Sequence, residues 1–331
     1  MLDPFRTTVS EPVQTFLVRI SNTFGLSTLP LHAHEVLLAL ALNALIAQAI
    51  SPAISARLFP DAYSRFSPRM RINWHVHVVS LVQSCLINAL SLYVILVDGE
   101  RRSWAQDDAD WHLRIWGYTG LTGFLQSFAL GYFLWDLYVC VRYVGMFGWG
   151  MVVHAVASSA MFTFGYRPFI HFYCPVFLLH ELSTPFLNIH WFCDKLDLTG
   201  SVYQAVNGVL LTTVFFCCRL VWGTRGSIGV FRDVYRATFT GIPPSQHLQD
   251  KVAQFPNYSN LEDPLGQTTS FMEARQLPLW LGASYLMANV ALALLNVFWF
   301  FKMVQAIRKR FDPPFGTRRV GNDKGNHSKE E

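Results

Sequence analysis

Seven long stretches of this sequence carry no charged side chain, or a single one, and they constrain the fold more than any other feature. Each stretch has at least 21 residues, and about 18 consecutive apolar residues suffice for a helix that crosses a membrane. The stretches are residues 36–56, 75–97, 115–141, 143–166, 168–193, 198–218 and 276–301. Only 15% of all residues are charged, against about a quarter in soluble domains. The sequence therefore predicts an all-α fold, a multipass transmembrane helical bundle of about seven spans.

The placement of charges predicts how this bundle is oriented. Basic residues dominate the loop at 57–71 and the tail at 302–331, whereas the segment at 98–110 is acidic. Because positively charged flanks of spans stay in the cytoplasm, we expect a luminal amino terminus and a cytoplasmic carboxyl terminus. The long segment at about 224–275 then forms a luminal loop, which carries a glycosylation sequon at Asn257.

Several classes of partner and site are not expected. The six cysteines lie inside spans or at their ends without a CxxC pair, which indicates neither a disulfide framework nor a zinc site. Histidines at the span entrances have i, i+2 spacing and do not share a helix face, so no metal site is predicted, and no cofactor is implied. Basic residues directly after a span are typical of topology determinants or contacts with anionic lipid, so no nucleic-acid partner is expected.

Ionisable side chains inside the spans are candidates for a functional site, because a charge in hydrocarbon is costly unless it faces a protein interior or water. At about 1.5 Å per residue, His154 lies about 16 Å and Glu181 about 18 Å from the cytoplasmic ends of their spans, with His180 adjacent. Asp136 lies about 9 Å deep. Arg219 is expected near the luminal end of its span, where its long side chain can reach the interface. Two histidines and a carboxylate thus share one level near the membrane midplane.

This group permits two interpretations. An imidazole with a carboxylate partner can act as a general base or nucleophile, or can bind the polar head of a lipid. Alternatively, His154, His180 and Glu181 form hydrogen bonds between helices and fix their packing. Pro175 and Pro185 flank His180 and Glu181, and helices broken by proline often border cavities in membrane proteins.

The same span carries a recognisable motif, His180-Glu181-Leu182-Ser183-Thr184-Pro185, followed by Asn188 and Trp191. This motif resembles the signature of the TLC domain family, which contains the ceramide synthases and a set of non-synthase relatives. Further matching pieces occur in the same order at Trp74, Gly131 to Leu137, Val153-His154 and Arg219. The resemblance covers about residues 70–301.

The resemblance implies six helices around a central cavity that is open to the cytoplasmic side, usually in the endoplasmic reticulum. It divides the chain into an external segment, first span and basic loop at 1–69, a TLC domain at 70–301, and a basic tail at 302–331. Ceramide synthases carry two adjacent histidines in the helix that matches the fourth span, and His-Asp in the next. Here Ala155 and Glu181 occupy the second positions, so the resemblance favours the non-synthase branch.

We therefore expect a lipid-handling protein that binds, transports or senses a phospholipid, sterol or sphingolipid in lipid homeostasis, without ceramide synthase activity. The expected lipid-binding residues are Asp136, His154, His180, Glu181, Ser183, Asn188 and Trp191. The alternative is an acyltransferase that uses His154 or His180, with Glu181 as the orienting acid. A seven-span receptor is a minor alternative, because Val141-Arg142-Tyr143 ends the third span without the acid that receptors place before this arginine.

Overall fold

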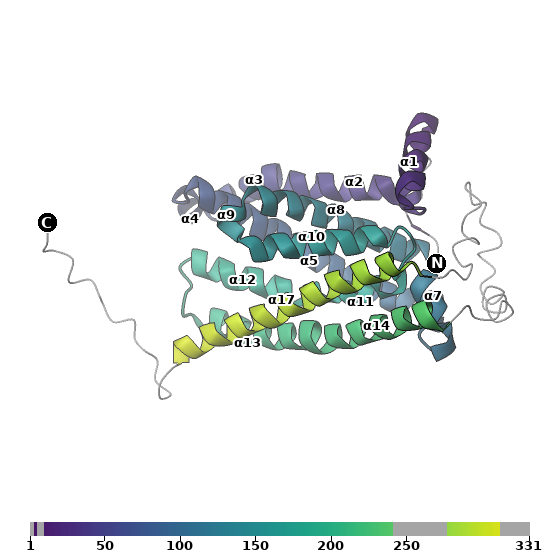
Figure 1. The fold of residues 1–331 in the computed structure, drawn as a ribbon. Helices are drawn as coiled ribbons and strands as arrows, with labels where there is room; N and C mark the ends of the chain where they lie inside the picture. Colours follow the sequence, from purple (N-terminus) through teal and green to yellow (C-terminus); the bar gives the residue numbers. More distant parts are fainter. Residues whose placement is uncertain (1–2, 5–9, 241–276, 312–331) are drawn as a thin grey trace, which may run out of the picture.

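The computed structural model is a bundle of helices that run side by side along one axis (Figure 1). It describes residues 3–4, 10–240 and 277–311, and no strand occurs among them. The predicted all-α bundle is thereby confirmed. The sequon at Asn257 and most of the tail at 302–331 lie outside the described residues.

The first half of the bundle contains three long helices joined by short ones. Its elements are α1 (Glu11–Phe24), α2 (Leu29–Leu45), the π-helical turn η1 (Ile46–Ile50), α3 (Ser51–Leu58), α4 (Pro60–Ser64), α5 (Pro68–Val97), α6 (Gly99–Ser103), the 3-10 turn η2 (Asp108–Asp110), α7 (Trp111–Trp116), α8 (Gly120–Arg142) and α9 (Val144–Phe147). The helix α1 stands across one end of the bundle, where α7 also lies; α4 and α9 mark the opposite end (Figure 1). We call these the α7 end and the α4 end.

The second half contains the elements that build the candidate site. They are α10 (Trp149–Phe164), the 3-10 turn η3 (His171–Tyr173), α11 (Cys174–Leu178), the 3-10 turn η4 (Leu179–Ser183), α12 (Thr184–Lys195), α13 (Val202–Phe215), the π-helical turn η5 (Phe216–Trp222), α14 (Gly223–Phe239) and α17 (Leu279–Phe311).

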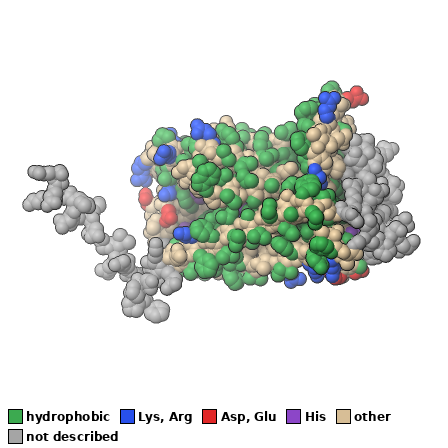
Figure 2. Space-filling model, viewed as in Figure 1, with side chains coloured by type: hydrophobic (Ala, Val, Ile, Leu, Met, Phe, Trp, Pro, Cys, Tyr) green, Lys and Arg blue, Asp and Glu red, His purple; other side chains and the backbone are tan. Residues whose placement is uncertain are grey.

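Among the residues that the structure describes, five continuous helices are long and apolar enough to cross a membrane. They cover Leu29–Leu58, Pro68–Val97, Gly120–Arg142, Val202–Phe239 and Leu279–Ile307. On the face shown in Figure 2, hydrophobic side chains cover the middle of the bundle, while charged side chains gather toward its two ends. This distribution matches a hydrocarbon layer between two polar surfaces, so the chain is an integral membrane protein.

The two other predicted spans are shorter or broken. The fourth corresponds to α10, which has 16 residues, and the fifth is divided into α11, η4 and α12. The break follows from Pro185, whose ring nitrogen cannot donate the helical hydrogen bond to the carbonyl of Glu181. That carbonyl instead accepts from the backbone N–H of Thr184 in a tighter 3-10 turn. The count of seven spans remains a prediction.

The sixth span is longer than expected, which corrects the predicted boundaries there. The sequence places its end at Cys218 and a luminal loop from about residue 224, but α13, η5 and α14 form one helix of 38 residues that ends at Phe239. Arg225, Arg232, Asp233 and Arg236 made this part of the chain resemble a loop. The structure shows that most of these charges lie where the helix contacts other charged groups.

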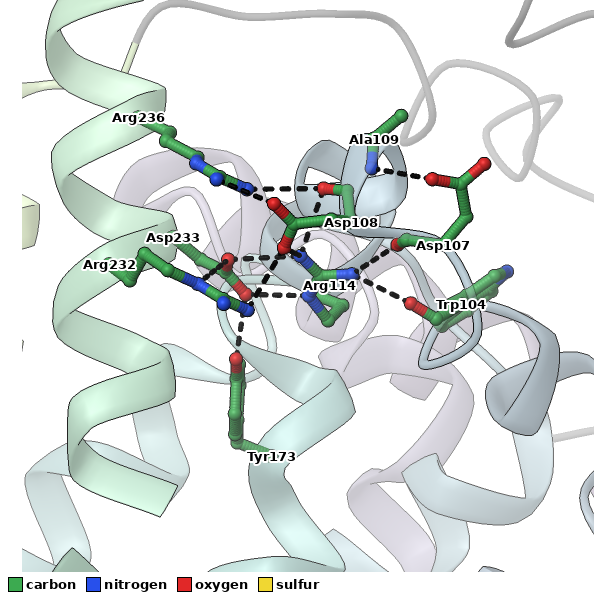
Figure 3. A network of polar contacts seen from close by, with 9 residues as sticks. All are labelled: Trp104, Asp107, Asp108, Ala109, Arg114, Tyr173, Arg232, Asp233 and Arg236. Carbon is green, nitrogen blue, oxygen red and sulfur yellow. Dashed lines mark hydrogen bonds and ion pairs between the residues drawn. The ribbon is translucent and has the colours of Figure 1, made fainter. Parts of the chain in front are cut away.

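These contacts form a polar network at the α7 end (Figure 3). The guanidinium of Arg114 donates to both carboxylate oxygens of Asp233, at 2.7 and 3.1 Å, and Tyr173 donates to the same carboxylate at 2.6 Å. Asp108 accepts from Arg236 at 2.6 Å and lies 3.2 Å from Arg232. Arg114 and Asp233 are 5% and 0% exposed. The acidic segment between α5 and α8 is therefore fastened to α14.

Below this network the hydrophobic core is rich in aromatic side chains. Trp116, Phe169 and Tyr173 are buried together with Val234 of α14 and Leu281 of α17. The core and the network hold α14 and α17 in place at the α7 end, and both helices then continue toward the middle of the bundle. There they border the candidate site.

Candidate functional site

A cavity of about 140 Å³ lies in the middle of the bundle, between α10, η4, the η5–α14 junction and α17. An engineered apolar cavity of about 150 Å³ in another protein binds benzene, so the cavity accommodates a group of that size rather than an entire lipid. Its apolar lining is contributed by Phe133, Met161, Phe162, Phe177, Leu178, Leu220, Leu292, Ala293 and Val297. Its polar lining is contributed by His154, Ser158, His180, Glu181, Arg219, Thr224, Ser227, Asn289 and Asn296.

Arg219 is the most highly connected polar residue of this cavity. Its Nε donates to Ser183 Oγ at 3.1 Å, and its Nη1 donates to Asn296 Oδ1 of α17 at 3.1 Å. Its Nη2 donates to Glu181 Oε1 at 3.4 Å and to Thr184 Oγ1 at 3.2 Å. The guanidinium thus joins the broken fifth span, the sixth span and the last helix, and it fixes the polar wall of the cavity.

Glu181 supplies the charge that balances Arg219. The two side chains are 13% and 8% exposed, and Thr184 donates to the second carboxylate oxygen of Glu181 at 2.6 Å. A buried charge is tolerated only with a partner of opposite charge and with hydrogen bonds. Glu181 and Arg219 meet this condition for each other, so both can stay charged inside the bundle. Among the described residues, no other lining side chain is an acid, a lysine or an arginine, so the charges of these lining side chains sum to zero.

The two histidines provide the polar atoms that the protein itself leaves available. His180 Nε2 is buried and has no hydrogen-bond partner in the described part of the chain. Its ring packs against Phe177 at 5.7 Å between centroids. The His154 ring packs edge-on to Trp299 of α17 at 5.4 Å. An unpartnered buried nitrogen at a cavity wall is a hydrogen-bonding position that a ligand can satisfy.

The structure therefore divides the predicted site residues into groups. His154, His180 and Glu181 line one cavity, and Ser183 reaches it through its contact with Arg219. Asp136 lies outside the lining; it is buried on α8 and accepts a weak hydrogen bond from Cys140 Sγ at 3.7 Å.

Asn188 and Trp191 lie further along α12 and contact a different histidine. Asn188 Oδ1 lies 2.7 Å from His77 Nδ1, and Asn188 Nδ2 donates to Ser80 at 3.1 Å. The ring of Trp191 stacks on His77, with centroids 4.0 Å apart. These two residues fasten α12 to α5 rather than line the cavity.

The predicted site omits most of the lining residues, and Arg219, Asn289 and Asn296 are the omissions whose cause the structure reveals. The expectation that Arg219 lies at the membrane interface is wrong, because its helix extends for another 20 residues to Phe239, which leaves the guanidinium in the interior. Asn289 and Asn296 are 4% and 5% exposed, and as uncharged residues of an apolar span they give no signal in a search for ionisable side chains. Their spacing of seven places them on one face of α17, and this was the signal available in the sequence.

Comparison with known proteins gives one consistent result. A family model for the TLC domain matches residues 73–305. A TLC domain-containing protein of Schizosaccharomyces pombe is 37% identical over 298 residues, which cover 90% of this chain and 86% of that protein. The protein of Saccharomyces cerevisiae named topoisomerase I damage affected protein 4 is 27% identical over 85% of this chain and 86% of its own length. Human TLC domain-containing protein 4 is 30% identical over 50% of this chain and 60% of its own length.

Proposed function

Since this chain belongs to the TLC domain family, whose members have membrane lipid-related roles, we propose that it binds a membrane lipid in the cavity and serves lipid homeostasis without making ceramide. The observation that carries this proposal is the polar cavity within an apolar bundle, with its unpartnered His180 Nε2. A lipid that enters from the bilayer brings its own polar atoms, and these meet the histidine and asparagine side chains.

The cavity also indicates which part of the lipid enters. Its volume of about 140 Å³ accepts a polar head or the polar segment next to it, while the acyl chains stay among the helices or in the bilayer. The opposite charges of Glu181 and Arg219 cancel each other, so this pair gives the cavity no net charge. An anionic phosphate would therefore find no unpaired arginine or lysine in the described lining, whereas a hydroxyl, ester or amide group can exchange hydrogen bonds with the histidine and asparagine side chains.

The test is to identify the lipids that co-purify with the full chain in mild detergent by mass spectrometry, with two histidine variants compared. His154→Ala removes a cavity imidazole, and His77→Ala removes an imidazole in another span that contacts Asn188 and Trp191 instead. We expect His154→Ala to lose the lipid and His77→Ala to keep it, at similar thermal stability. If His154→Ala keeps the lipid, or loses it only in proportion to its stability, the histidine is a packing residue.

A catalytic role for the same histidines is the alternative, because both line the cavity beside a carboxylate. The geometry disfavours it: the carboxylate oxygens of Glu181 contact Arg219 and Thr184, so Glu181 does not orient either imidazole. In addition, Ala155 stands where ceramide synthases have a second histidine. Microsomes that contain this protein, from cells without their own synthases, should form no ceramide from a long-chain base and acyl-CoA. Robust ceramide formation would replace the binding proposal with the acyltransferase alternative.

We further propose that the protein resides in the endoplasmic reticulum with its amino terminus luminal and its carboxyl terminus cytoplasmic. The basic loop at 57–71 and the basic tail support this orientation. An antibody should reach a tag at the carboxyl terminus after selective permeabilisation of the plasma membrane. A tag that becomes accessible only after all membranes are dissolved would reverse the orientation.

A further inference from the structure

A second buried cluster of ionisable side chains lies away from the cavity, where α2 begins at the α7 end. His32 and Glu35 are 0% and 1% exposed, and His32 Nδ1 lies 2.7 Å from Glu35 Oε2. Asp3, which precedes the first helix, places its Oδ2 3.6 Å from the same nitrogen. The nearest ligand atoms of the three residues all lie within 4.8 Å of one another.

The local structure explains why these side chains meet. His32 and Glu35 are three residues apart on α2 and therefore share a helix face. That face is turned toward α8, where Gly123 leaves room for the imidazole: a Cβ at this position would lie only 2.2 Å from His32 Nε2. Tyr118, just before α8, places its hydroxyl 2.5 Å from the same Nε2. Both ring nitrogens of His32 are thus held in defined positions.

The cluster contains more acceptor capacity than the described protein atoms satisfy. Glu35 Oε1 is buried and has no hydrogen-bond partner among the residues that the structure describes, and an unsatisfied buried carboxylate oxygen is costly. A cation held between the two carboxylates and the imidazole would compensate the charge of the buried Glu35 carboxylate, to which this oxygen belongs. The mixture of one nitrogen and several oxygen donors suits a divalent transition metal such as Zn²⁺.

We propose that Asp3, His32 and Glu35 bind a zinc ion that ties the start of the chain to α2. Zinc–ligand bonds of about 2.0–2.1 Å in tetrahedral geometry separate neighbouring ligand atoms by about 3.3 Å. The distances of 2.7 and 3.6 Å from His32 Nδ1 bracket this separation, and the three ligand atoms lie within 4.8 Å of one another. Side-chain shifts would bring these three donors to the metal, and a water molecule would take the fourth position. When Nδ1 binds the metal, Nε2 carries the ring proton and donates a hydrogen bond to the Tyr118 hydroxyl oxygen. Histidines that bind a metal usually donate such a hydrogen bond from their other ring nitrogen.

Residue spacing does not indicate this site, because His32 and His34 are two residues apart and do not share a helix face. The relevant pair is His32 with Glu35, and the third ligand comes from a chain segment 29 residues earlier. No spacing rule joins Asp3 to α2.

The test uses the full chain purified in detergent with a tag that contains no histidine. After treatment with a chelator, the protein is dialysed against Zn²⁺, and bound zinc per chain is measured by mass spectrometry of the metal. We expect one equivalent in the unmodified chain and its loss in Asp3→Asn and Glu35→Gln. Glu11→Gln removes an exposed carboxylate of α1 and serves as the matched control, which should keep the equivalent.

Two further measurements make the result decisive. Asp3 precedes the first helix, so we expect Asp3→Asn to leave the bundle folded. Its loss of zinc therefore tests the proposal even if Glu35→Gln fails to fold. Tyr118→Phe should keep the site but weaken zinc binding by about 10- to 100-fold, as removal of a histidine's outer partner does. X-ray absorption at the zinc edge should show nitrogen and oxygen ligands. A chain that binds no zinc, a spectrum with sulfur ligands, or variants that bind zinc as well as the unmodified chain would each overturn the proposal.

Discussion

Gly223→Ala offers a direct test of the cavity, because this glycine lies where the η5 turn meets α14 and contacts His180. A Cβ at residue 223 would lie 2.3 Å from His180 Nε2, whereas ordinary van der Waals contact begins at 3.4 Å. The imidazole must therefore move away by about 1 Å, the difference between these two distances. Because the ring already borders the cavity, we expect it to move into the cavity and reduce the space for a ligand. Such overpacking costs about 1–3 kcal/mol, against a gain of up to about 1 kcal/mol when alanine replaces glycine in a helix.

Gly208→Ala is the matched control on the same continuous helix. A Cβ at residue 208 meets its nearest neighbour, His190 Cε1, at an ordinary 3.6 Å, so this variant should be as stable as the unmodified chain or gain up to about 1 kcal/mol. For Gly223→Ala we expect a net loss of about 0–3 kcal/mol together with a clear loss of co-purified lipid. Thermal unfolding in detergent and lipid mass spectrometry measure the two quantities. Equal lipid content in both variants would refute the reasoning, because the displaced His180 ring would then not obstruct the ligand.

Three further predictions concern charged residues. Arg219→Met leaves the Glu181 carboxylate without its partner and should destabilise the protein by about 3–5 kcal/mol, measured by unfolding in mixed SDS micelles. A loss below about 1 kcal/mol, which is typical of exposed pairs, would contradict the buried pairing. Asp233→Asn removes the negative charge that pairs with the buried Arg114. It should lower the free energy of unfolding by about 3–5 kcal/mol as well, measured by the same unfolding assay. The hydrogen bond from Arg236 lowers the pKa of Asp108 below 3.8, so this contact stabilises the fold above pH 3.8 and the stabilisation is lost as the pH falls below it. Asp108→Asn should remove this acid dependence of the melting temperature, and an unchanged dependence would assign it to other carboxylates.

The sequence predicts the parts of this molecule that depend on length and composition. The helical rise is constant, so counting residues from the ends of two spans correctly brings His154 and Glu181 to one cavity. What counting cannot supply is the direction in which a side chain points around its helix. Asn188 lies on the same broken span as Glu181 but faces α5, because the 3-10 turn before Pro185 and the helix after it set the direction of each separately.

The end of the sixth span shows a second kind of limit. Charged residues after Gly223 interrupt the apolar run, and composition alone cannot tell a solvated loop from a helix whose charges are paired. The pairing of Asp233 with Arg114 joins residues 119 positions apart, and such tertiary contacts are invisible to a local pattern. Because the sequence predicts that the helix ends near Cys218, it wrongly places Arg219 at the membrane interface, although Arg219 lies in the interior of the bundle.

The π-helical turn at Phe216–Trp222 has a consequence for how this sequence can change in length. A π-helical turn accommodates one residue more than an α-helical turn does, so deletion of one residue there would restore the regular helix. The residues on either side of the deletion would keep nearly the same relative rotation, because the π-helical turn already takes up the extra residue. A deletion in the regular α-helix at residues 224–232 would instead rotate Asp233 by about 100° and turn it away from Arg114. We therefore expect a single-residue deletion within the π-helical turn to lower the thermal stability less than a single-residue deletion at residues 224–232.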